Sequence, residues 1–116
     1  MQFKLSSKEK EELRKQLYKR DGCRCHYCGI EEYQFPVIWL QDRKFYGLEL
    51  RGYRLEIDRK NHKKGYCLKN CVLACALCNM AKSNILEYEE FKKVGNVIRE
   101  IWQRKSGVTK RPLIEK

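Results

Sequence analysis

The sequence lacks any long uninterrupted run of apolar residues. Charged side chains break every apolar stretch well before the roughly 18 residues that a membrane-spanning helix needs. The Lys-rich, amphiphilic residues after Met1 also lack the apolar core of a secretory signal peptide. No internal repeat or domain boundary stands out. These absences predict one soluble domain with no membrane partner, in a reducing intracellular compartment, the cytoplasm.

Acidic residues are also in short supply. Asp and Glu number 15 against 26 Lys and Arg, which gives a formal net charge of +11. The acids gather at residues 9–12 and 87–90, whereas residues 59–69 contain five basic residues and no acid. A positive surface concentrates polyanions and releases their counterions, so we expect nucleic acid as the partner, DNA ahead of RNA. The alternative is a basic, solvated surface without a cognate polyanion.

The seven cysteines do not indicate a disulfide framework, because their number is odd and no signal peptide precedes them. Four of them form two Cys-x-x-Cys pairs, Cys25/Cys28 and Cys75/Cys78. Such pairs supply Zn²⁺ with four thiolates in tetrahedral geometry, and a domain with a modest core benefits from a metal clamp. We predict a structural zinc site made of these four cysteines. The alternatives are four buried free thiols, or Cys23 as a ligand if Cys25 turns away.

The two remaining cysteines, Cys67 and Cys71, flank Asn70 at a spacing of four. They can form a second metal site with His62, or they can pack a hairpin as small apolar side chains, which is the interpretation that we favour. His26 lies inside the first cysteine pair, where we expect a solvent-facing side chain or a hydrogen bond beside the metal.

Two long helices are predicted. Ser6-x-x-Glu9 has the form of a capping box, and apolar residues follow at helical spacing until Asp21-Gly22 breaks the pattern, so the first helix spans about residues 7–20. A second amphipathic helix spans about residues 87–105, and residues 108–116 form a basic tail. The apolar residues that recur in the second helix are Tyr88, Phe91, Val94, Ile98, Ile101 and Trp102.

Short strands are predicted between the helices. Residues 35–40 and 53–57 are rich in β-branched and aromatic side chains. A turn at residues 63–66 and the apolar run at residues 71–74 indicate a hairpin that leads into Cys75, and a helix should begin near Cys78 and Asn79. Aromatic and basic residues alternate over residues 27–54, where they either stack on nucleic acid or form core strands with polar outer faces.

The ordered motifs resemble a known family. Leu55-Glu56-Ile57-Asp58-Arg59, Gly65-Tyr66, Asn70 and Cys75-Ala76-Leu77-Cys78-Asn79 follow one another after the cysteine pair at residues 25–28. This combination, over residues 20–84, resembles the HNH endonucleases, the zinc-stapled ββα-metal (His-Me finger) nucleases frequent in phages and mobile elements. The resemblance implies an α+β fold: one HNH-like domain over residues 1–107, with an N-terminal helix, a four-cysteine zinc site and a long C-terminal helix.

The resemblance also assigns roles. Asp58, expected to end the first strand, and Asn79 match the ligands of a catalytic Mg²⁺ or Mn²⁺, whose hard character suits oxygen donors. Asn70 matches the family's middle Asn, which spans the loop and positions the strand. The implied activity is hydrolysis of DNA phosphodiester bonds, with the metal neutralising charge and a base deprotonating water.

The sequence departs from the family at Arg59, where the general-base His normally stands. A guanidinium stays protonated and cannot accept a proton, although it can hold a phosphate. His62 is the nearest imidazole, but in an extended chain it would lie about 13 Å from Asp58, at roughly 3.3 Å per residue. His62 can serve as base only if the loop folds back, and water activated by the metal alone is the alternative.

Three functions follow from these features. The first is an endonuclease, and the second is a catalytically degenerate HNH-fold module that binds nucleic acid without turnover. The third is a zinc-stapled protein-interaction module, for which the high positive charge serves no purpose. Monomer and homodimer both remain open. The basic residues expected to contact nucleic acid are Arg59, Lys60, Lys63, Lys64, Lys69 and Lys82.

Overall fold

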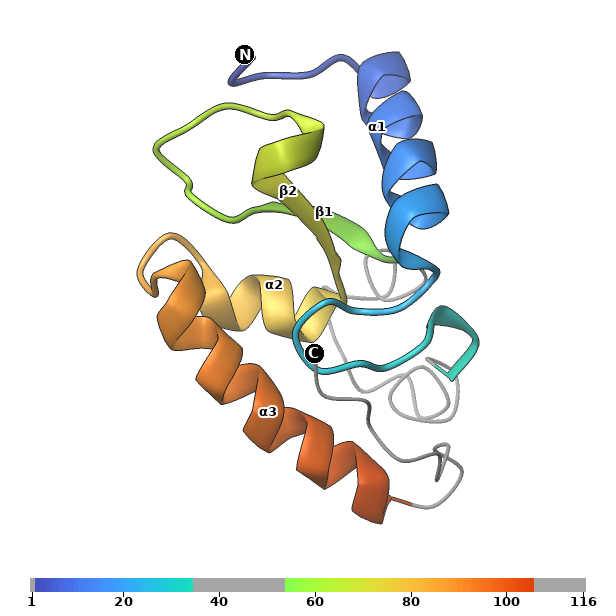
Figure 1. Cartoon of the computed structure of the whole chain (residues 1–116), viewed down its shortest axis with the longest axis vertical. Coiled ribbons are helices and arrows are strands. Elements are labelled where there is room, and N and C mark those ends of the chain that lie inside the picture. The colour runs from blue at the N-terminus through green and yellow to red at the C-terminus, as the bar shows by residue number, and fades with distance from the viewer. Residues whose placement is uncertain (1, 35–53, 106–116) are drawn as a thin grey trace.

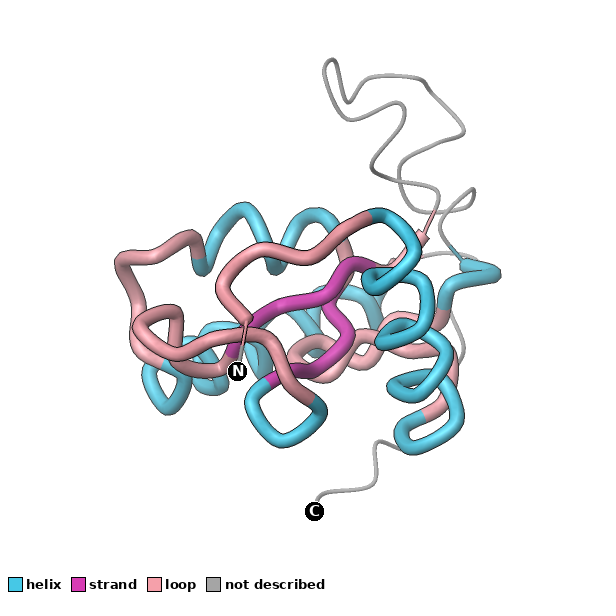
Figure 2. Tube along the Cα trace, turned by 90° about the horizontal axis from the view of Figure 1, so that it is seen from above, coloured by secondary structure: helices cyan, strands magenta, loops and turns pink. Residues whose placement is uncertain are grey.

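The computed structural model describes residues 2–34 and 54–105, and Figure 1 shows the path of the chain. These residues form an α+β arrangement of a two-stranded antiparallel sheet and three α-helices, which confirms the predicted fold class. Seen from above, both strands lie in the centre with helical segments around them (Figure 2). The elements are α1 (Ser7–Asp21), β1 (Glu56–Arg59), β2 (Cys71–Ala74), α2 (Ala76–Lys82) and α3 (Tyr88–Arg104), with short 3₁₀ turns at Glu32–Gln34 and Leu68–Asn70.

The first predicted helix is confirmed as α1. The Ser6 hydroxyl accepts a hydrogen bond from the Glu9 amide, and the Glu9 carboxylate accepts one from the Ser6 amide, which completes the capping box. The helix stops at Gly22, whose φ of 84° lies in the left-handed region that glycine adopts without strain. Its buried side chains, Leu13 and Leu17, belong to the core that α1 shares with the sheet.

The predicted hairpin is confirmed, but its first strand has different bounds. β1 pairs antiparallel with β2, with Asp58 opposite Val72 and Arg59 opposite Cys71. The expected strand over residues 53–57 is therefore shifted toward the C-terminus, and Asp58 lies inside β1 instead of ending it. Pairing with the buried β2 determines which residues are extended, and it overrides the local preference of the residues before Glu56. The strand expected over residues 35–40 lies outside the described residues.

α2 begins two residues earlier than predicted. Cys75 is its N-cap, in an extended conformation, and the Cys75 sulfur accepts a hydrogen bond from the Cys78 amide. The helix thus follows directly on β2, so that β1, β2 and α2 form one continuous ββα unit (Figure 1). The position of the cap places Cys78 in the first turn of α2 and Asn79 immediately after it.

The second long helix is confirmed as α3. Glu87 is its N-cap, and the Glu87 amide donates a hydrogen bond to the Glu90 carboxylate. α3 packs against the segment that holds the first cysteine pair. A Cβ atom at Gly95 would lie 2.6 Å from the Tyr27 carbonyl oxygen, so the helix approaches that backbone as closely as only glycine allows. Phe91 packs edge-on against the Tyr27 ring, with centroids 5.0 Å apart. No helix in the described part of the chain is long and apolar enough to cross a membrane.

We expect Gly95→Ala to destabilise the protein. In a helix interior this change normally adds roughly 1 kcal/mol of stability. Here the new methyl group meets a backbone carbonyl that cannot rotate away, and overpacking of this kind costs about 1–3 kcal/mol. Urea unfolding should therefore show a net loss, whereas the exposed neighbour Asn96 should tolerate alanine within about 0.5 kcal/mol. A stabilised Gly95→Ala variant would contradict the close packing of α3.

Candidate active site

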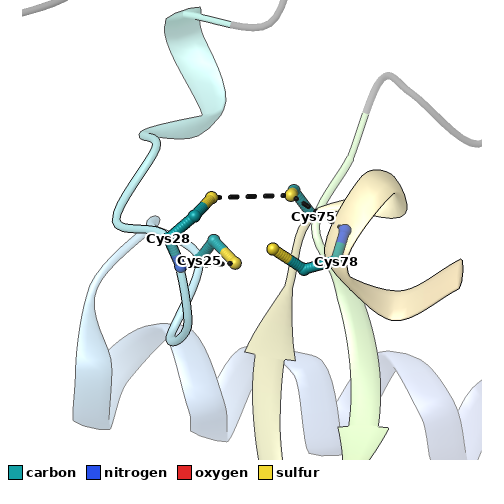
Figure 3. A group of neighbouring side chains, drawn as sticks. All are labelled: Cys25, Cys28, Cys75 and Cys78. Carbon is teal, nitrogen blue, oxygen red and sulfur yellow. Dashed lines mark hydrogen bonds between the residues drawn. The ribbon is translucent and has the colours of Figure 1, made fainter. Parts of the chain in front are cut away.

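Four cysteine sulfurs converge where α2 meets the segment after α1. Cys25 and Cys28 approach from one side and Cys75 and Cys78 from the other (Figure 3). Their sulfur atoms all lie within 4.8 Å of one another, and the four residues are at most 1 % exposed. A tetrahedral Zn²⁺ with bonds of about 2.3 Å needs sulfurs about 3.8 Å apart, and Cys28 and Cys75 are 3.7 Å apart. The cluster fits a zinc site. Cys23 is exposed and lies outside it.

Hydrogen-bond donors surround these sulfurs. The Cys28 amide points at the Cys25 sulfur, and the indole N–H of Trp102 lies 3.1 Å from the Cys28 sulfur. Burial raises the pKa of the Cys25 thiol, but hydrogen bonds from Cys28, Cys75 and Cys78 outweigh burial and lower this pKa well below its usual value. A thiolate is the form that binds zinc, and Cys25 favours this form, whereas hydrogen bonds to Cys25 and Cys28 raise the pKa of the Cys75 and Cys78 thiols. Zinc binding therefore has to displace protons from Cys75 and Cys78.

A polar pocket of about 190 Å³ opens beside the ββα unit. It brings together four of the five residues predicted to act in catalysis: Asp58, Arg59, His62 and Asn79. The loop after β1 therefore folds back, as the interpretation of His62 required. The other residues that line the pocket are Ile57, Tyr66, Ser83 and Asn84.

Asp58 is only 6 % exposed, and one of its oxygens is held by two partners. Its Oδ2 accepts a 2.6 Å hydrogen bond from the Tyr27 hydroxyl and lies 3.4 Å from the Lys82 amine. Burial raises the pKa of Asp58, and the Tyr27 hydrogen bond and the Lys82 charge partly oppose this. Tyr27 was not predicted to be a site residue, because nothing in the local sequence links it to a carboxylate 31 positions away.

The prediction that Lys82 contacts nucleic acid is wrong. Lys82 is 1 % exposed, and its amine donates to the Arg59 carbonyl at 3.1 Å in addition to its ion pair with Asp58. A buried ammonium needs such partners, and here β1 supplies both of them. The long aliphatic stem therefore packs inward from α2 instead of reaching the surface.

Asn79 is oriented by Glu56, which was not predicted to be a site residue. Its side-chain nitrogen donates a 2.7 Å hydrogen bond to Glu56 Oε1. Because a carboxylate only accepts hydrogen bonds, the amide nitrogen must face Glu56 and the amide oxygen is directed away from it. Glu56 and Asp58 are two positions apart in β1 and so share a face of the strand. The alternation of side chains along a strand could have predicted that Glu56 lies on the same face as Asp58.

Asn70 does not line the pocket but spans the loop that carries His62. Its side-chain nitrogen donates to the carbonyls of Asn61 and Gly65, and its side-chain oxygen accepts from the Asn61 amide. These three hydrogen bonds, of 2.9–3.1 Å, close the loop between the two strands. This geometry is what a positioning residue requires, and the role itself stays a prediction.

The remaining basic residues occupy different environments. The Arg59 guanidinium lies 4.8 Å from the Tyr66 ring centroid and donates to the Lys64 carbonyl. The Lys60 amine lies 5.4 Å from the Tyr88 ring centroid, and Tyr88 shares a 2.7 Å hydrogen bond with the exposed His26. The side chains of Lys63, Lys64 and Lys69 are exposed.

Cys71 and Cys67 do not form a second metal cluster. Cys71 is fully buried in the core, and burial raises the pKa of its thiol. Within residues 2–34 and 54–105, the four-cysteine group is the only set of three or more clustered metal-binding side chains. Cys71 therefore packs as a small apolar side chain.

Two strands followed directly by a helix, with a four-cysteine cluster at the junction, are the arrangement expected of an HNH endonuclease domain. A solved structure of the rare-cutting HNH restriction endonuclease PacI is similar to this chain, with a TM-score of 0.59 and 26 % sequence identity over 93 % of this chain and 90 % of that one. No protein-family model matches the chain, and no curated protein matches it. The predicted resemblance to the HNH endonucleases is confirmed, and the likeness supports the nuclease class of hydrolases.

Proposed function

We propose that this protein is a metal-dependent endonuclease that nicks or cuts DNA, with zinc in a purely structural role. The observation that carries the proposal is the polar pocket that brings Asp58, Asn79, His62 and Arg59 together on the ββα unit. The likeness to a restriction endonuclease supports DNA as the substrate. The chain's excess of basic residues, of which Lys63, Lys64 and Lys69 are exposed, favours a polyanionic partner.

The pocket residues fit a hard divalent cation. A carboxylate oxygen of Asp58 and the amide oxygen of Asn79 are the donor types that Mg²⁺ and Mn²⁺ prefer. Glu56 turns the amide oxygen of Asn79 away from itself, so that oxygen is available as a donor. When bound, the cation supplies charge neutralisation at the scissile phosphate and the leaving oxygen.

The chain's own residues perform the remaining steps. His62 accepts the proton of the attacking water, because it is the imidazole that lines the pocket with Asp58 and Asn79. Arg59 is held at the pocket edge by Tyr66 and donates hydrogen bonds to the non-bridging phosphate oxygens. Asn70 keeps the loop closed so that His62 stays near the attacking water.

The test is a plasmid-nicking assay in Mg²⁺ or Mn²⁺, with EDTA as the metal-free control. We expect Asp58→Ala and Asn79→Ala each to lose more activity than the roughly 10–100-fold that is typical when only a supporting residue is removed. Both variants must retain zinc. Asn96→Ala, a matched amide on the exposed side of α3, should cleave like the wild type. Equal cleavage by all four proteins would reveal a contaminant and refute the assignment.

A second candidate function is binding of nucleic acid without turnover. This function is favoured because Arg59 stands where the HNH family has its general-base histidine. DNA binding that weakens steeply with salt, without cleavage in any metal, would establish this function instead. Absence of both cleavage and binding would leave the protein-interaction module.

A further inference from the structure

Tyr27 connects the cysteine cluster to the pocket. It lies between Cys25 and Cys28 in the chain, it is 2 % exposed, and its hydroxyl donates the 2.6 Å hydrogen bond to Asp58 Oδ2. The backbone of Tyr27 therefore belongs to the turn that carries two of the four cysteines, and its hydroxyl contacts the Asp58 carboxylate of the pocket.

The Tyr27 side chain has little freedom to move. Its ring packs edge-on against Phe91 at 5.0 Å and edge-on against His26 at 5.2 Å. Its carbonyl oxygen accepts a hydrogen bond from Arg99 and abuts Gly95 of α3. The position of the hydroxyl is thus set by the turn between the two cysteines and by α3.

The hydrogen bond constrains how Asp58 can bind a cation. Tyr27 and Lys82 both contact Oδ2 of the Asp58 carboxylate. The other oxygen, Oδ1, is therefore the one that can bind a cation. Lys82 brings a positive charge that opposes cation binding, whereas Tyr27 is a neutral donor and orients the carboxylate without that repulsion. Partners of this kind typically control the affinity of a site through the ligand that they hold.

We propose that Tyr27 is a positioning residue that couples zinc binding at the four cysteines to divalent-cation binding at Asp58, an inference that rests on the proposed function. Zinc fixes the turn from Cys25 to Cys28, the turn fixes Tyr27, and Tyr27 fixes the carboxylate. Zinc thereby affects the pocket without being part of it.

The test compares Tyr27→Phe with Tyr18→Phe, a matched control. Tyr18 also donates a 2.6 Å hydrogen bond to a carboxylate, that of Glu32, but it does not line the pocket. Mn²⁺ binding is measured directly by electron paramagnetic resonance of free Mn²⁺, and zinc is counted in each protein. For Tyr27→Phe we expect full zinc content and about tenfold weaker Mn²⁺ binding. The Mn²⁺ concentration that half-saturates cleavage should rise by the same factor, with little change in the rate at saturation.

Several results would overturn the proposal. Unchanged Mn²⁺ affinity in Tyr27→Phe, or an equal loss in Tyr18→Phe, would show that the hydrogen bond is only structural. Wild-type affinity in Asp58→Ala would instead refute the proposed cation site itself, and with it this inference. The two failures are therefore distinguishable.

A second measurement uses the wild-type protein, so it holds even if Tyr27→Phe loses zinc. Tyrosine labelled with ¹³C at Cζ reports on each phenol by NMR. Added Mg²⁺ should shift the Tyr27 signal in the wild type and leave the Tyr18 signal in place, and Asp58→Ala should abolish the Tyr27 shift. A Tyr27 chemical shift that does not change when Mg²⁺ is added would refute the coupling.

Discussion

Removal of zinc is expected to unfold the domain. The four cysteines are part of the buried core and join the turn after α1 to the junction of β2 and α2. Structural zinc sites contribute about 10–16 kcal/mol to folding, which equals or exceeds the roughly 5–15 kcal/mol by which a whole domain is usually stable. Without the ion, four adjacent buried thiols would be held only by weak hydrogen bonds to one another and to neighbouring N–H groups. Circular dichroism during titration with a strong zinc chelator should show loss of helix in step with zinc release.

The matched variants are Cys78→Ser and Cys23→Ser. Cys78 belongs to the cluster and is fully buried, whereas Cys23 is exposed and outside it. We expect Cys78→Ser to lose zinc and its cooperative melting transition, and Cys23→Ser to keep both. A Cys78→Ser protein that melts like the wild type would show that the four-sulfur cluster is not a metal site.

Features that depend on neighbours in the sequence were predictable. The Cys-x-x-Cys spacing allows one turn to supply two ligands, so the cluster follows from the sequence alone. The capping box at Ser6 likewise marks the start of α1, and the spacing of apolar residues predicted α3.

Features that depend on tertiary packing were not predictable. The start of β1 is set by pairing with β2, and the burial of Lys82 depends on a carboxylate 24 positions earlier in the chain. The Tyr27 hydrogen bond to Asp58 joins residues 31 positions apart, and no periodicity reports such a contact. The residues that can bind a metal in the pocket were therefore predictable from the sequence, whereas the residues that orient them were not.

Replacement of His62 by alanine is expected to lower the rate of DNA cleavage by about 10²–10⁴-fold, the usual contribution of a general base. Asn70 closes the loop that carries His62, and the pocket contains His62 together with Asp58 and Asn79. The rate should be measured in a single turnover at saturating metal, so that only the chemical step changes. DNA binding should be unaffected.

The chain contains one other histidine, which provides a matched control. His26 is exposed, shares a hydrogen bond with Tyr88, and does not line the pocket. We expect His26→Ala to cleave at the wild-type rate at saturating metal, because its ring packs against Tyr27, which acts on metal affinity and not on the rate at saturation. If His62→Ala cleaves as fast as His26→Ala, the base is not an imidazole, and water activated by the metal alone becomes the simpler mechanism.

A double variant then separates the role of the imidazole from its position. Arg59→His in the His62→Ala background moves the imidazole to the position after Asp58 that the HNH family uses, within the same pocket. If a base is what His62→Ala lacks, the double variant should regain part of the lost rate, whereas Arg59→Ala in that background should not. Equal inactivity of the two double variants would mean that Arg59 is required for phosphate binding in its own right, since its guanidinium is lost in both.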